Sequence, residues 1–403
     1  MPQRLLQVLS LVLVLLLFFI SLELMGDSFK LMGKGVAENL VSTTRNPFVG
    51  LFIGILATSM VQSSSTVTAM VVGIVAGGGL TVAGAVPIMM GANIGTSVTN
   101  TIVSLGHITR KDEFRRAMAG ATVHDFFNLL AVAVLFPVEL LTGAISRSAH
   151  ALEEAVIGLG GADLLSPVKV ITDPVAEWVI GLASENGIVV LLVGVVGLFI
   201  ALRYLVKLLR ALLLGRSEKL LHKYVFGHPL AALFFGVVIT VMVQSSSITT
   251  SVMVPMVGAG IVTVAQIFPF VLGANIGTTV TSILAALVLA GGTGAAGEAA
   301  LTVAFAHFFF NVFGIALLWP LPFLRRVPIW LAEKLGELSV KNRGYAFGYI
   351  ALVFFVLPVL VIVGTRGLDT TFYEEVLPEE SLEVPEELRL PGEASTEDSL
   401  EAL

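Results

Sequence analysis

Two identical clusters of polar side chains interrupt apolar stretches of this sequence. VQSSSTVTAM begins at Val61, and VQSSSITTSV begins at Val243, 182 positions later, so one glutamine and three serines recur in the same order. Where a helix breaks at such a point, the serine hydroxyls can satisfy the freed backbone. The helix that restarts there directs its unpaired N–H groups and its positive dipole end toward an anion. The repetition therefore predicts two halves of one anion site.

The candidate anion ligands are the polar residues of both clusters and one asparagine that follows each cluster. They are Gln62, Ser63, Ser64, Ser65, Asn93, Gln244, Ser245, Ser246, Ser247 and Asn275. Serines in membrane helices also bond back to the carbonyl four residues earlier or join neighbouring helices, and one isolated pair would favour that structural role. Four polar residues repeated in register favour a binding site.

The motif GANIGT also occurs twice, at Gly91 and at Gly273, again 182 positions apart. Its threonine and the one three residues later share a helix face, and their neutral oxygens are hard ligands that an alkali cation accepts. The candidate cation ligands are Thr96, Thr99, Thr278 and Thr281, beside the amide oxygens of the two asparagines. The glycines of the motif, four residues apart, also predict close helix packing, a role that can coexist with ion binding.

A third block extends the repetition. ATVHDFFNLLAVAVLFP, which ends at Pro137, returns at an offset of 183 as VAFAHFFFNVFGIALLWP, which ends at Pro320. Because three separate blocks keep nearly the same offset, the sequence indicates an internal duplication rather than a shared apolar composition.

The third block carries the other polar residues expected inside the membrane. They are His124 and Asn128 in the first copy, and His307 and Asn311 in the second, and they predict a structural hydrogen-bond network. Asp125 is a functional candidate, as any acid buried in lipid is. Phe308 takes its place in the second copy, so we do not expect Asp125 to belong to a twofold-symmetric site.

The composition decides which solvent surrounds the chain. Hydrophobic residues make up 56% of the 403 residues and charged residues only 13%, well below the ~25% that is usual in a soluble domain. This predicts an all-α polytopic membrane protein. Asp369–Leu403, with twelve acidic residues and the single base Arg389, is predicted to be a solvated, disordered tail. The chain has no cysteine, which excludes disulfides and thiolate metal sites.

Each QSSS cluster lies in an apolar segment, 47–76 or 229–258. Each segment is longer than the ~20 residues of one membrane-spanning helix. An unbroken helix would therefore be longer than the hydrocarbon core requires. We expect a broken helix or a re-entrant helical hairpin in each copy, with the cluster at the break, because irregular backbone inside a membrane must be buried or line a cavity.

The distribution of lysine and arginine predicts the orientation of the chain. The loops 110–116, 203–223 and 325–343 are rich in these residues and are placed in the cytoplasm, whereas the loop 147–186 is poor in them and is placed outside. The two copies then have inverted topology, as in many secondary transporters. The other membrane helices are expected at about 5–25, 117–143, 187–208, 300–323 and 345–363.

The predicted organisation has six parts. They are a first transmembrane helix and connector (1–45), the first copy (46–145), an extracellular loop with a linking helix and a basic cytoplasmic loop (146–227), the second copy (228–325), a basic loop with the last transmembrane helix (326–366), and the acidic disordered tail (367–403). The first helix is too long for a signal peptide and lacks a cleavage site. We expect the N-terminus in the cytoplasm and the tail outside the cell membrane.

These residues resemble the signature stretches of the type II sodium-dependent phosphate cotransporter family. The resemblance rests on both QSSS clusters, on GANIGTSVTNTIVSL and on FRRAMAGATVHDFFNLLAVAVLFPVELLTG, and extends from Gly35 to Val363. It implies a phosphate site formed by the serines of both clusters. It also implies a sodium site built from Gln244, Ser245, Thr278 and Thr281, to which the duplication adds Gln62, Ser63, Thr96 and Thr99. The short loop 147–186 makes the chain similar to a compact bacterial member.

The expected function is sodium-coupled import of inorganic phosphate by alternating access, with sodium as the coupling ion and no cofactor. The expected partners are phosphate, sodium and the lipid bilayer, and no nucleic acid. One alternative is sodium- or proton-coupled transport of another small oxyanion. A second is an intramembrane serine hydrolase that would use Ser64, His124 and Asp125, although the chain lacks a G-x-S-x-G elbow. A third is a receptor or scaffold that moves no solute.

Overall fold

The computed structural model of the chain describes residues 2–32, 44–158, 166–213, 225–290 and 294–365. These residues form helices joined by turns, and no strand occurs among them, which confirms the predicted all-α class. The acidic tail at 367–403 lies outside the described residues, as does 214–224 of the predicted basic loop.

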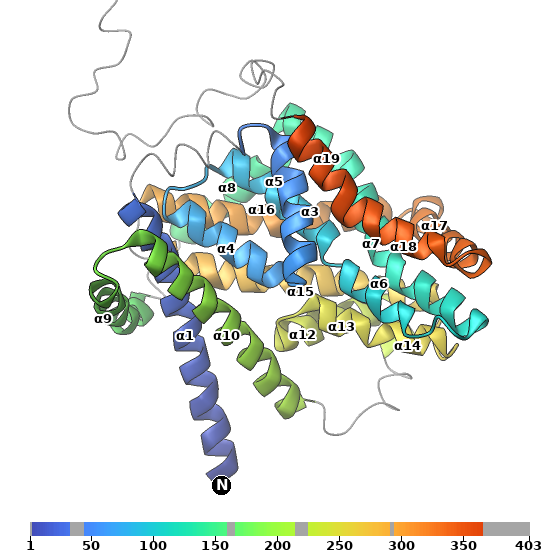
Figure 1. Cartoon of the computed structure of the whole chain (residues 1–403), viewed down its shortest axis with the longest axis horizontal. Helices are drawn as coiled ribbons and strands as arrows, with labels where there is room; N and C mark the ends of the chain where they lie inside the picture. The colour runs from blue at the N-terminus through green and yellow to red at the C-terminus, as the bar shows by residue number, and fades with distance from the viewer. Residues whose placement is uncertain (1, 33–43, 159–165, 214–224, 291–293, 366–403) are drawn as a thin grey trace, which may run out of the picture.

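The helices run closely one after another along the chain (Figure 1). In the first half they are α1 (Pro2–Met32), α3 (Pro47–Val61), α4 (Ser64–Ala76), α5 (Val82–Gly95), α6 (Val98–Leu105), α7 (Lys111–Thr142), α8 (Ala144–Gly158), α9 (Ser166–Leu182) and α10 (Gly187–Leu213). In the second half they are α12 (Pro229–Val243), α13 (Ser246–Ser251), α14 (Met253–Gly258), α15 (Val264–Ala290), α16 (Ala295–Leu318), α17 (Pro322–Lys341), α18 (Gly344–Ala351), a short π-helix (Leu352–Val356) and α19 (Leu357–Gly364).

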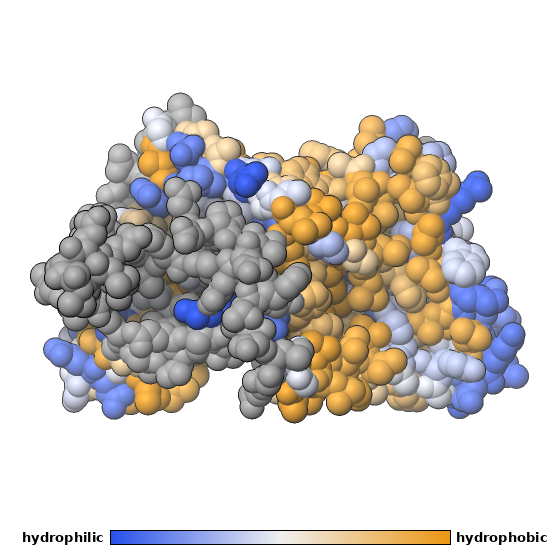
Figure 2. Space-filling view, turned by 90° about the horizontal axis from the view of Figure 1, so that it is seen from above, coloured by the Kyte–Doolittle hydropathy of each residue, from blue (hydrophilic) through white to orange (hydrophobic). Residues whose placement is uncertain are grey.

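Six segments of the described chain are long and apolar enough to cross a membrane. They are Leu9–Met32, Val82–Leu105, Lys111–Thr142, Val264–Ala290, Ala295–Leu318 and Gly344–Gly364. Figure 2 shows hydrophobic surface across the middle of one face and hydrophilic residues toward its right end. Both observations confirm the multi-pass membrane architecture.

The helix is broken at each QSSS cluster. α3 ends at Val61 and α4 restarts at Ser64, while α12 ends at Val243 and α13 restarts at Ser246. α3 and α12 have 15 residues each, or about 22 Å at 1.5 Å per residue, so neither spans a ~30 Å hydrocarbon core alone. The predicted interruption is present in both copies. The inverted relation of the two copies stays a prediction, as does the division into six parts.

The helix that ends at each cluster packs at backbone distance against the helix that carries GANIGT. A Cβ on Gly91 of α5 would lie 1.9 Å from the carbonyl oxygen of Leu51, and a Cβ on Gly273 of α15 would lie 1.9 Å from that of Leu233. Only glycine permits this approach. The packing role predicted for these glycines is confirmed, and it brings the clusters close to the candidate threonines.

Two expected loops are largely helical. The segment 147–186 contains most of α8 and all of α9, and the segment 325–343 falls mainly within α17. α8 packs against α16 and α17 packs against α7, so the last long helix of each copy is covered by the helix that follows the other copy. The charged residues of α8 and α17 lower their hydropathy, which is why they resembled loops. α7 begins at Lys111 rather than near 117, and α16 ends at Leu318 rather than near 323.

Candidate functional site

The glutamines of the two clusters share an unusual backbone conformation. Gln62 has φ 57° and Gln244 has φ 55°, in the left-handed region that residues other than glycine rarely adopt. Each ends its helix, and its N–H bonds at 2.7 Å to the carbonyl oxygen of a threonine four residues earlier, Thr58 or Thr240. Such a conformation costs on the order of 1 kcal/mol and is enriched at functional sites. It redirects the chain so that a new helix begins at the serines.

The first serine of each cluster caps the helix that restarts. The hydroxyl of Ser63 accepts a hydrogen bond from the N–H of Thr66 at 3.3 Å, and that of Ser245 accepts one from Ile248 at 3.3 Å. This is the ordinary N-cap role of serine. Both residues were predicted to bind an anion and sodium, and their hydroxyls also have this structural task.

The second serine of each cluster has a hydroxyl that is left free. Ser64 and Ser246 are the first residues of α4 and α13, and their exposed fractions are only 3% and 2%. Neither hydroxyl forms a hydrogen bond with another described residue, although buried polar groups are normally paired. These two hydroxyls are therefore the donors most available to a ligand at the start of the restarted helices.

The third serine of each cluster reaches the other copy. Ser65 donates to the carbonyl oxygen of Gln244 at 3.3 Å, and Ser247 donates to the carbonyl oxygen of Thr96 at 3.4 Å. The structure therefore brings the two breaks together, although they lie far apart in sequence.

The contacts of the glutamine side chains distinguish the two copies. Thr281 donates from Oγ1 to Oε1 of Gln244 at 2.6 Å, and the Gln244 amide donates to the carbonyl oxygen of Val241 at 2.5 Å. In the first copy Gln62 is exposed, and its side chain bonds to no other described residue. The buried Oγ1 of Thr99 likewise has no partner. Two predicted cation ligands, Gln244 and Thr281, are thus joined in the second copy, whereas no hydrogen bond among the described residues joins Gln62 and Thr99 in the first.

A hydrogen-bond network of asparagines and one histidine also links the two copies. Oδ1 of Asn275 lies 2.5 Å from Nε2 of His124, and its Nδ2 donates to Oδ1 of Asn128 at 2.9 Å. Asn128 in turn donates to the carbonyl oxygen of Asn93 at 2.8 Å. Because Asn275 uses both amide atoms here, it could ligate an anion only if this network opened. The described contacts match the structural network expected for His124 and Asn128.

The other predicted residues bond within their own copy. Thr96 and Thr278 donate to the carbonyl oxygens four residues earlier, at 2.8 and 2.9 Å. Nδ1 of His307 lies 3.3 Å from the hydroxyl of Ser282, and Asn311 donates to the carbonyl oxygen of His307 at 2.9 Å. Thr96 and Thr278 therefore have the structural role that hydroxyls often take inside membrane helices.

A contact between Asp125 and the last membrane segment was not predicted. Asp125 is 0% exposed, and its Oδ2 accepts hydrogen bonds from Thr101 at 3.3 Å and from the phenol of Tyr349 at 3.0 Å. Its Oδ1 forms no hydrogen bond with any residue that the structure describes. Tyr349 lies on α18, outside both copies and 224 positions from Asp125, and no motif in the sequence connects the two residues.

Two further threonines beside the clusters did not enter the prediction. Thr58 and Thr240 stand four residues before each glutamine and are both 0% exposed. Within the described part of the chain, neither Oγ1 has a hydrogen-bond partner. An alignment of the copies could have found them, because ATSMVQSSS and ITVMVQSSS share this threonine at the same offset as the clusters.

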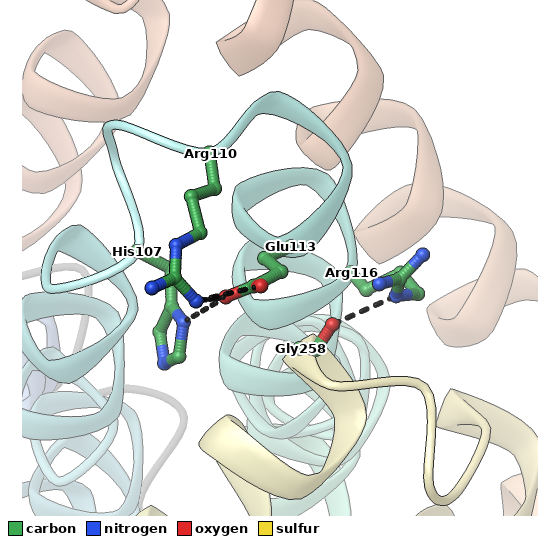
Figure 3. Close-up of polar contacts among 5 residues, drawn as sticks. All are labelled: His107, Arg110, Glu113, Arg116 and Gly258. Carbon is green, nitrogen blue, oxygen red and sulfur yellow. Dashed lines mark hydrogen bonds and ion pairs between the residues drawn. The ribbon is translucent and has the colours of Figure 1, made fainter.

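The basic residues that the structure describes bond elsewhere than at the clusters. Among the described contacts, no lysine or arginine bonds to either QSSS cluster. Arg110 and His107, in the turn before α7, lie 2.9 and 3.3 Å from carboxylate oxygens of Glu113 (Figure 3). Arg116, on α7, donates from Nε to the carbonyl oxygen of Gly258 at 2.8 Å. An anion at the clusters would depend on neutral donors, helix N-termini and any co-bound cation.

The residues considered for a hydrolase are not arranged as a catalytic triad. His124 bonds through Nε2 to Asn275, and the carboxylate of Asp125 bonds to Thr101 and Tyr349. No described hydrogen bond joins the histidine to the acid or to Ser64, as a Ser–His–Asp relay requires.

Comparisons with known proteins agree with the motifs. The family model described as Na+/Pi-cotransporter matches residues 17–164 and 198–361. Sodium-dependent phosphate transport protein 2B of Homo sapiens is 35% identical over 441 residues, which cover 86% of this chain and 63% of that protein. Sodium-dependent phosphate transport protein 2A of Rattus norvegicus is 35% identical over 422 residues, which cover 86% of this chain and 66% of that protein. The chain thus spans less than two thirds of the length of these relatives, and no solved structure matches it. Because the family model matches most of this chain, the chain belongs to the Na+/Pi-cotransporter family, a family of transporters and not of enzymes.

Proposed function

We propose that this chain is a sodium-coupled symporter that imports inorganic phosphate across a cell membrane. Relatives named sodium-dependent phosphate transport proteins support the choice of substrate and coupling ion. The observation that carries the proposal is the meeting of the two breaks, where Ser65 of one copy donates to Gln244 of the other. A small anion placed there could take hydrogen bonds from both copies at once.

The anion is held by neutral donors. Ser64 and Ser246 supply two buried hydroxyls without a described partner, and the first turn of α4 supplies backbone N–H groups at its positive end. A hydrogen bond to a charged group inside a protein is worth ~1.5 to 3 kcal/mol. A few such bonds give useful affinity without a fixed arginine, which would make release of the anion slower.

Sodium supplies the missing positive charge. Burying a phosphate anion without a counter-charge is costly, and no lysine or arginine bonds to the clusters among the described contacts. Oε1 of Gln244 and Oγ1 of Thr281 are 2.6 Å apart, so a small shift would let both oxygens face one cation. Binding of sodium then favours binding of phosphate, and the reverse holds because linkage is reciprocal.

The difference between the copies supports alternating access. The Gln244–Thr281 contact is made, whereas no hydrogen bond among the described residues joins the equivalent Gln62 and Thr99. In a transporter built from two similar halves, the two facing states are expected to exchange the conformations of those halves. The opposite-facing state would then join Gln62 to Thr99 and release Gln244.

Uptake by purified protein in liposomes tests the proposal. Labelled phosphate should accumulate under an inward sodium gradient, and accumulation should collapse when an ionophore dissipates that gradient. Potassium should not replace sodium, and excess sulfate should compete far less than unlabelled phosphate. Uptake driven by a proton gradient without sodium, or stronger competition by another oxyanion, would replace the proposal with the alternative transport function. No uptake of any solute by folded protein would favour a receptor or scaffold.

A further inference from the structure

α17 is a 20-residue helix between two candidate membrane spans. Ala295–Leu318 precedes it and Gly344–Gly364 follows it, and α17 itself is not among the segments apolar enough to cross. A helix between two successive spans begins and ends on the same side of the membrane. Its ~30 Å length therefore extends along one membrane surface rather than through the bilayer.

One face of α17 is fixed against the rest of the protein. Pro328, Ala332, Gly336 and Ser339 are buried, at the spacing of one helix face. A Cβ on Gly336 would lie 2.4 Å from the carbonyl oxygen of Arg115 on α7, so the two helices touch at backbone distance. This contact determines which residues of α17 point away from the protein.

The outward face of the first half of α17 is apolar and aromatic. Phe323, Val327 and Trp330 are 66%, 37% and 59% exposed. They stand at positions i, i+4 and i+7, which form one stripe along a helix. Tryptophan is enriched where membrane and water meet, so this stripe has the chemistry of a membrane-interface contact.

Unpaired positive charge lies in the same half of α17 as the stripe. Arg325 and Arg326 form no ion pair or side-chain hydrogen bond with another described residue. In the second half the charges cancel, because the residues are Glu333, Lys334, Glu337 and Lys341. Lys334 and Glu337 are 3.1 Å apart, and the hydrogen bond from Lys334 lowers the pKa of Glu337, so this carboxylate is ionised near neutral pH. The net charge of α17 is therefore concentrated in the half that carries the aromatic stripe.

We propose that the first half of α17 binds the headgroups of anionic lipids. Phe323, Val327 and Trp330 lie among the upper acyl chains, and Arg325 and Arg326 contact lipid phosphates, to which a guanidinium can donate two parallel hydrogen bonds. The arginines of the predicted basic segment place this surface on the cytoplasmic side, where anionic lipids create a negative surface potential.

α8 provides a comparison within the same chain. It follows the first copy as α17 follows the second, and it also packs against a long helix of the other copy. None of its described residues is an exposed large hydrophobic residue. Its polar groups include His150 and Glu153, whose side chains are 2.8 Å apart. The aromatic and basic surface therefore belongs to α17 and is not a general feature of helices in this position.

Quenching of Trp330 fluorescence by brominated lipids tests the proposal directly. The chain has three tryptophans, so Trp178→Phe with Trp319→Phe leaves Trp330 as the only indole. The full-length protein is placed in liposomes that contain an equal mole fraction of either brominated phosphatidylglycerol or brominated phosphatidylcholine. The anionic lipid should quench at a several-fold lower content, because each arginine near an anionic surface contributes about fivefold to binding.

Two sets of variants separate binding by the arginines from general charge effects. Arg325→Gln with Arg326→Gln should make the two lipids quench equally, and Arg326→Gln alone should remove part of the preference. Lys334→Gln changes the charge of the same helix by the same amount per residue and should keep the preference. Equal quenching by both lipids in the parent, no quenching by either lipid, or an unchanged preference in the double arginine variant would overturn the proposal.

If the protein with two tryptophan substitutions does not stay folded, native mass spectrometry gives the same comparison. Anionic lipid retained per protein is counted for the otherwise unsubstituted chain and its arginine variants, and should fall in the double variant but not in Lys334→Gln. Both measurements are made without added inorganic phosphate or sodium. A negative result in them would therefore not contradict the transport proposal, and an absence of phosphate uptake would not contradict lipid binding by α17.

Discussion

Ser246 and Ser251 lie on the same short helix but differ in their hydroxyl contacts. The Ser246 hydroxyl is buried and bonds to no other described residue, whereas Ser251 donates to the carbonyl oxygen of Ile248 at 3.1 Å. Ser246→Ala should weaken phosphate binding by ~1.5 to 3 kcal/mol, because it removes a donor from a desolvated anion. That loss corresponds to one or two decades in affinity.

The phosphate concentration for half-maximal uptake at saturating sodium measures this loss. Ser251→Ala removes the same atom from the same helix and should change that concentration less than twofold. Similar values for the two variants would mean that the Ser246 hydroxyl does not contact the anion.

Thr281 and Thr279 offer a similar comparison for sodium. Thr281 donates to Gln244 at 2.6 Å, whereas Thr279 donates to the carbonyl oxygen of Ile276 at 2.7 Å in its own helix. Thr281→Val keeps the shape and removes one candidate sodium ligand, so we expect it to raise the sodium concentration for half-maximal uptake about tenfold, the effect of ~1.4 kcal/mol. Thr279→Val should leave that concentration unchanged. A normal sodium dependence in Thr281→Val would assign the cation to other oxygens.

Single residues show what the sequence could and could not predict at the site. The duplicated QSSS and GANIGT motifs predicted which side chains lie near each other, because two copies of one motif are expected to form two halves of one site. The Asp125–Tyr349 contact involves one residue without a counterpart and another outside both copies. It depends on how α18 docks, which is determined by tertiary packing and not by local pattern.

At the scale of helices, α12 and α15 pack at backbone distance. A Cβ on Gly273 would meet a backbone carbonyl at 1.9 Å, whereas a Cβ on Gly348 of α18 would meet no heavy atom within 4 Å. Gly273→Ala should lower the stability of the folded protein by ~1 to 3 kcal/mol, the usual cost of overpacking, and shift the adjacent cluster.

Thermal unfolding in detergent tests this effect. Gly348→Ala should be neutral or slightly stabilising, since alanine is the better helix former. If both substitutions were equally tolerated, α12 and α15 would have to be less tightly packed than the structure indicates.

Arg116 joins α7 to the end of α14. Its Nε donates at 2.8 Å to the carbonyl oxygen of Gly258, the last residue of α14, where a positive charge also complements the helix dipole. Because Arg116 is half-buried, Arg116→Gln should cost about 1.5 kcal/mol, the low end for a charged hydrogen bond. Arg115→Gln, at an exposed position without such a bond, should cost almost nothing in the same thermal assay. Equal losses would indicate a general charge effect.

Hydropathy predicted the apolar spans better than the amphipathic helices. The last span was expected at 345–363 and is found at Gly344–Gly364, because uniform apolar composition is a strong local signal. For α8 and α17 hydropathy predicts loops, because both helices carry charged residues and their buried faces include small residues such as Ala149 and Gly336. Only contact with a helix of the other copy gives those faces a partner.

At the scale of the whole molecule, the two copies cover each other. α8 packs against α16 and α17 packs against α7. Burial raises the pKa of Glu153 on α8, and the carboxylate of Glu298 near the start of α16 contributes to that shift. The end of the first copy and the beginning of α16 therefore lie close together. This proximity supports the expected inversion, in which α7 finishes on the side of the membrane where α16 starts.

Single cysteines can test that inversion, because the chain has none of its own. Lys111 and Lys341 lie at exposed positions at the start of α7 and at the end of α17, and Glu154 and Glu298 lie at exposed positions on α8 and near the start of α16. In intact cells an impermeant maleimide should label cysteines at Glu154 and Glu298. Cysteines at Lys111 and Lys341 should react only after permeabilisation, because the positive-inside rule places them in the cytoplasm. Glu298 decides the question, since it corresponds in the second copy to the beginning of α7 in the first. If the two copies had the same orientation, Glu298→Cys would be labelled only after permeabilisation, as Lys111→Cys is. That result would rule out the inverted arrangement. The proposed exchange, in which Gln62 joins Thr99 when Gln244 leaves Thr281, depends on that arrangement.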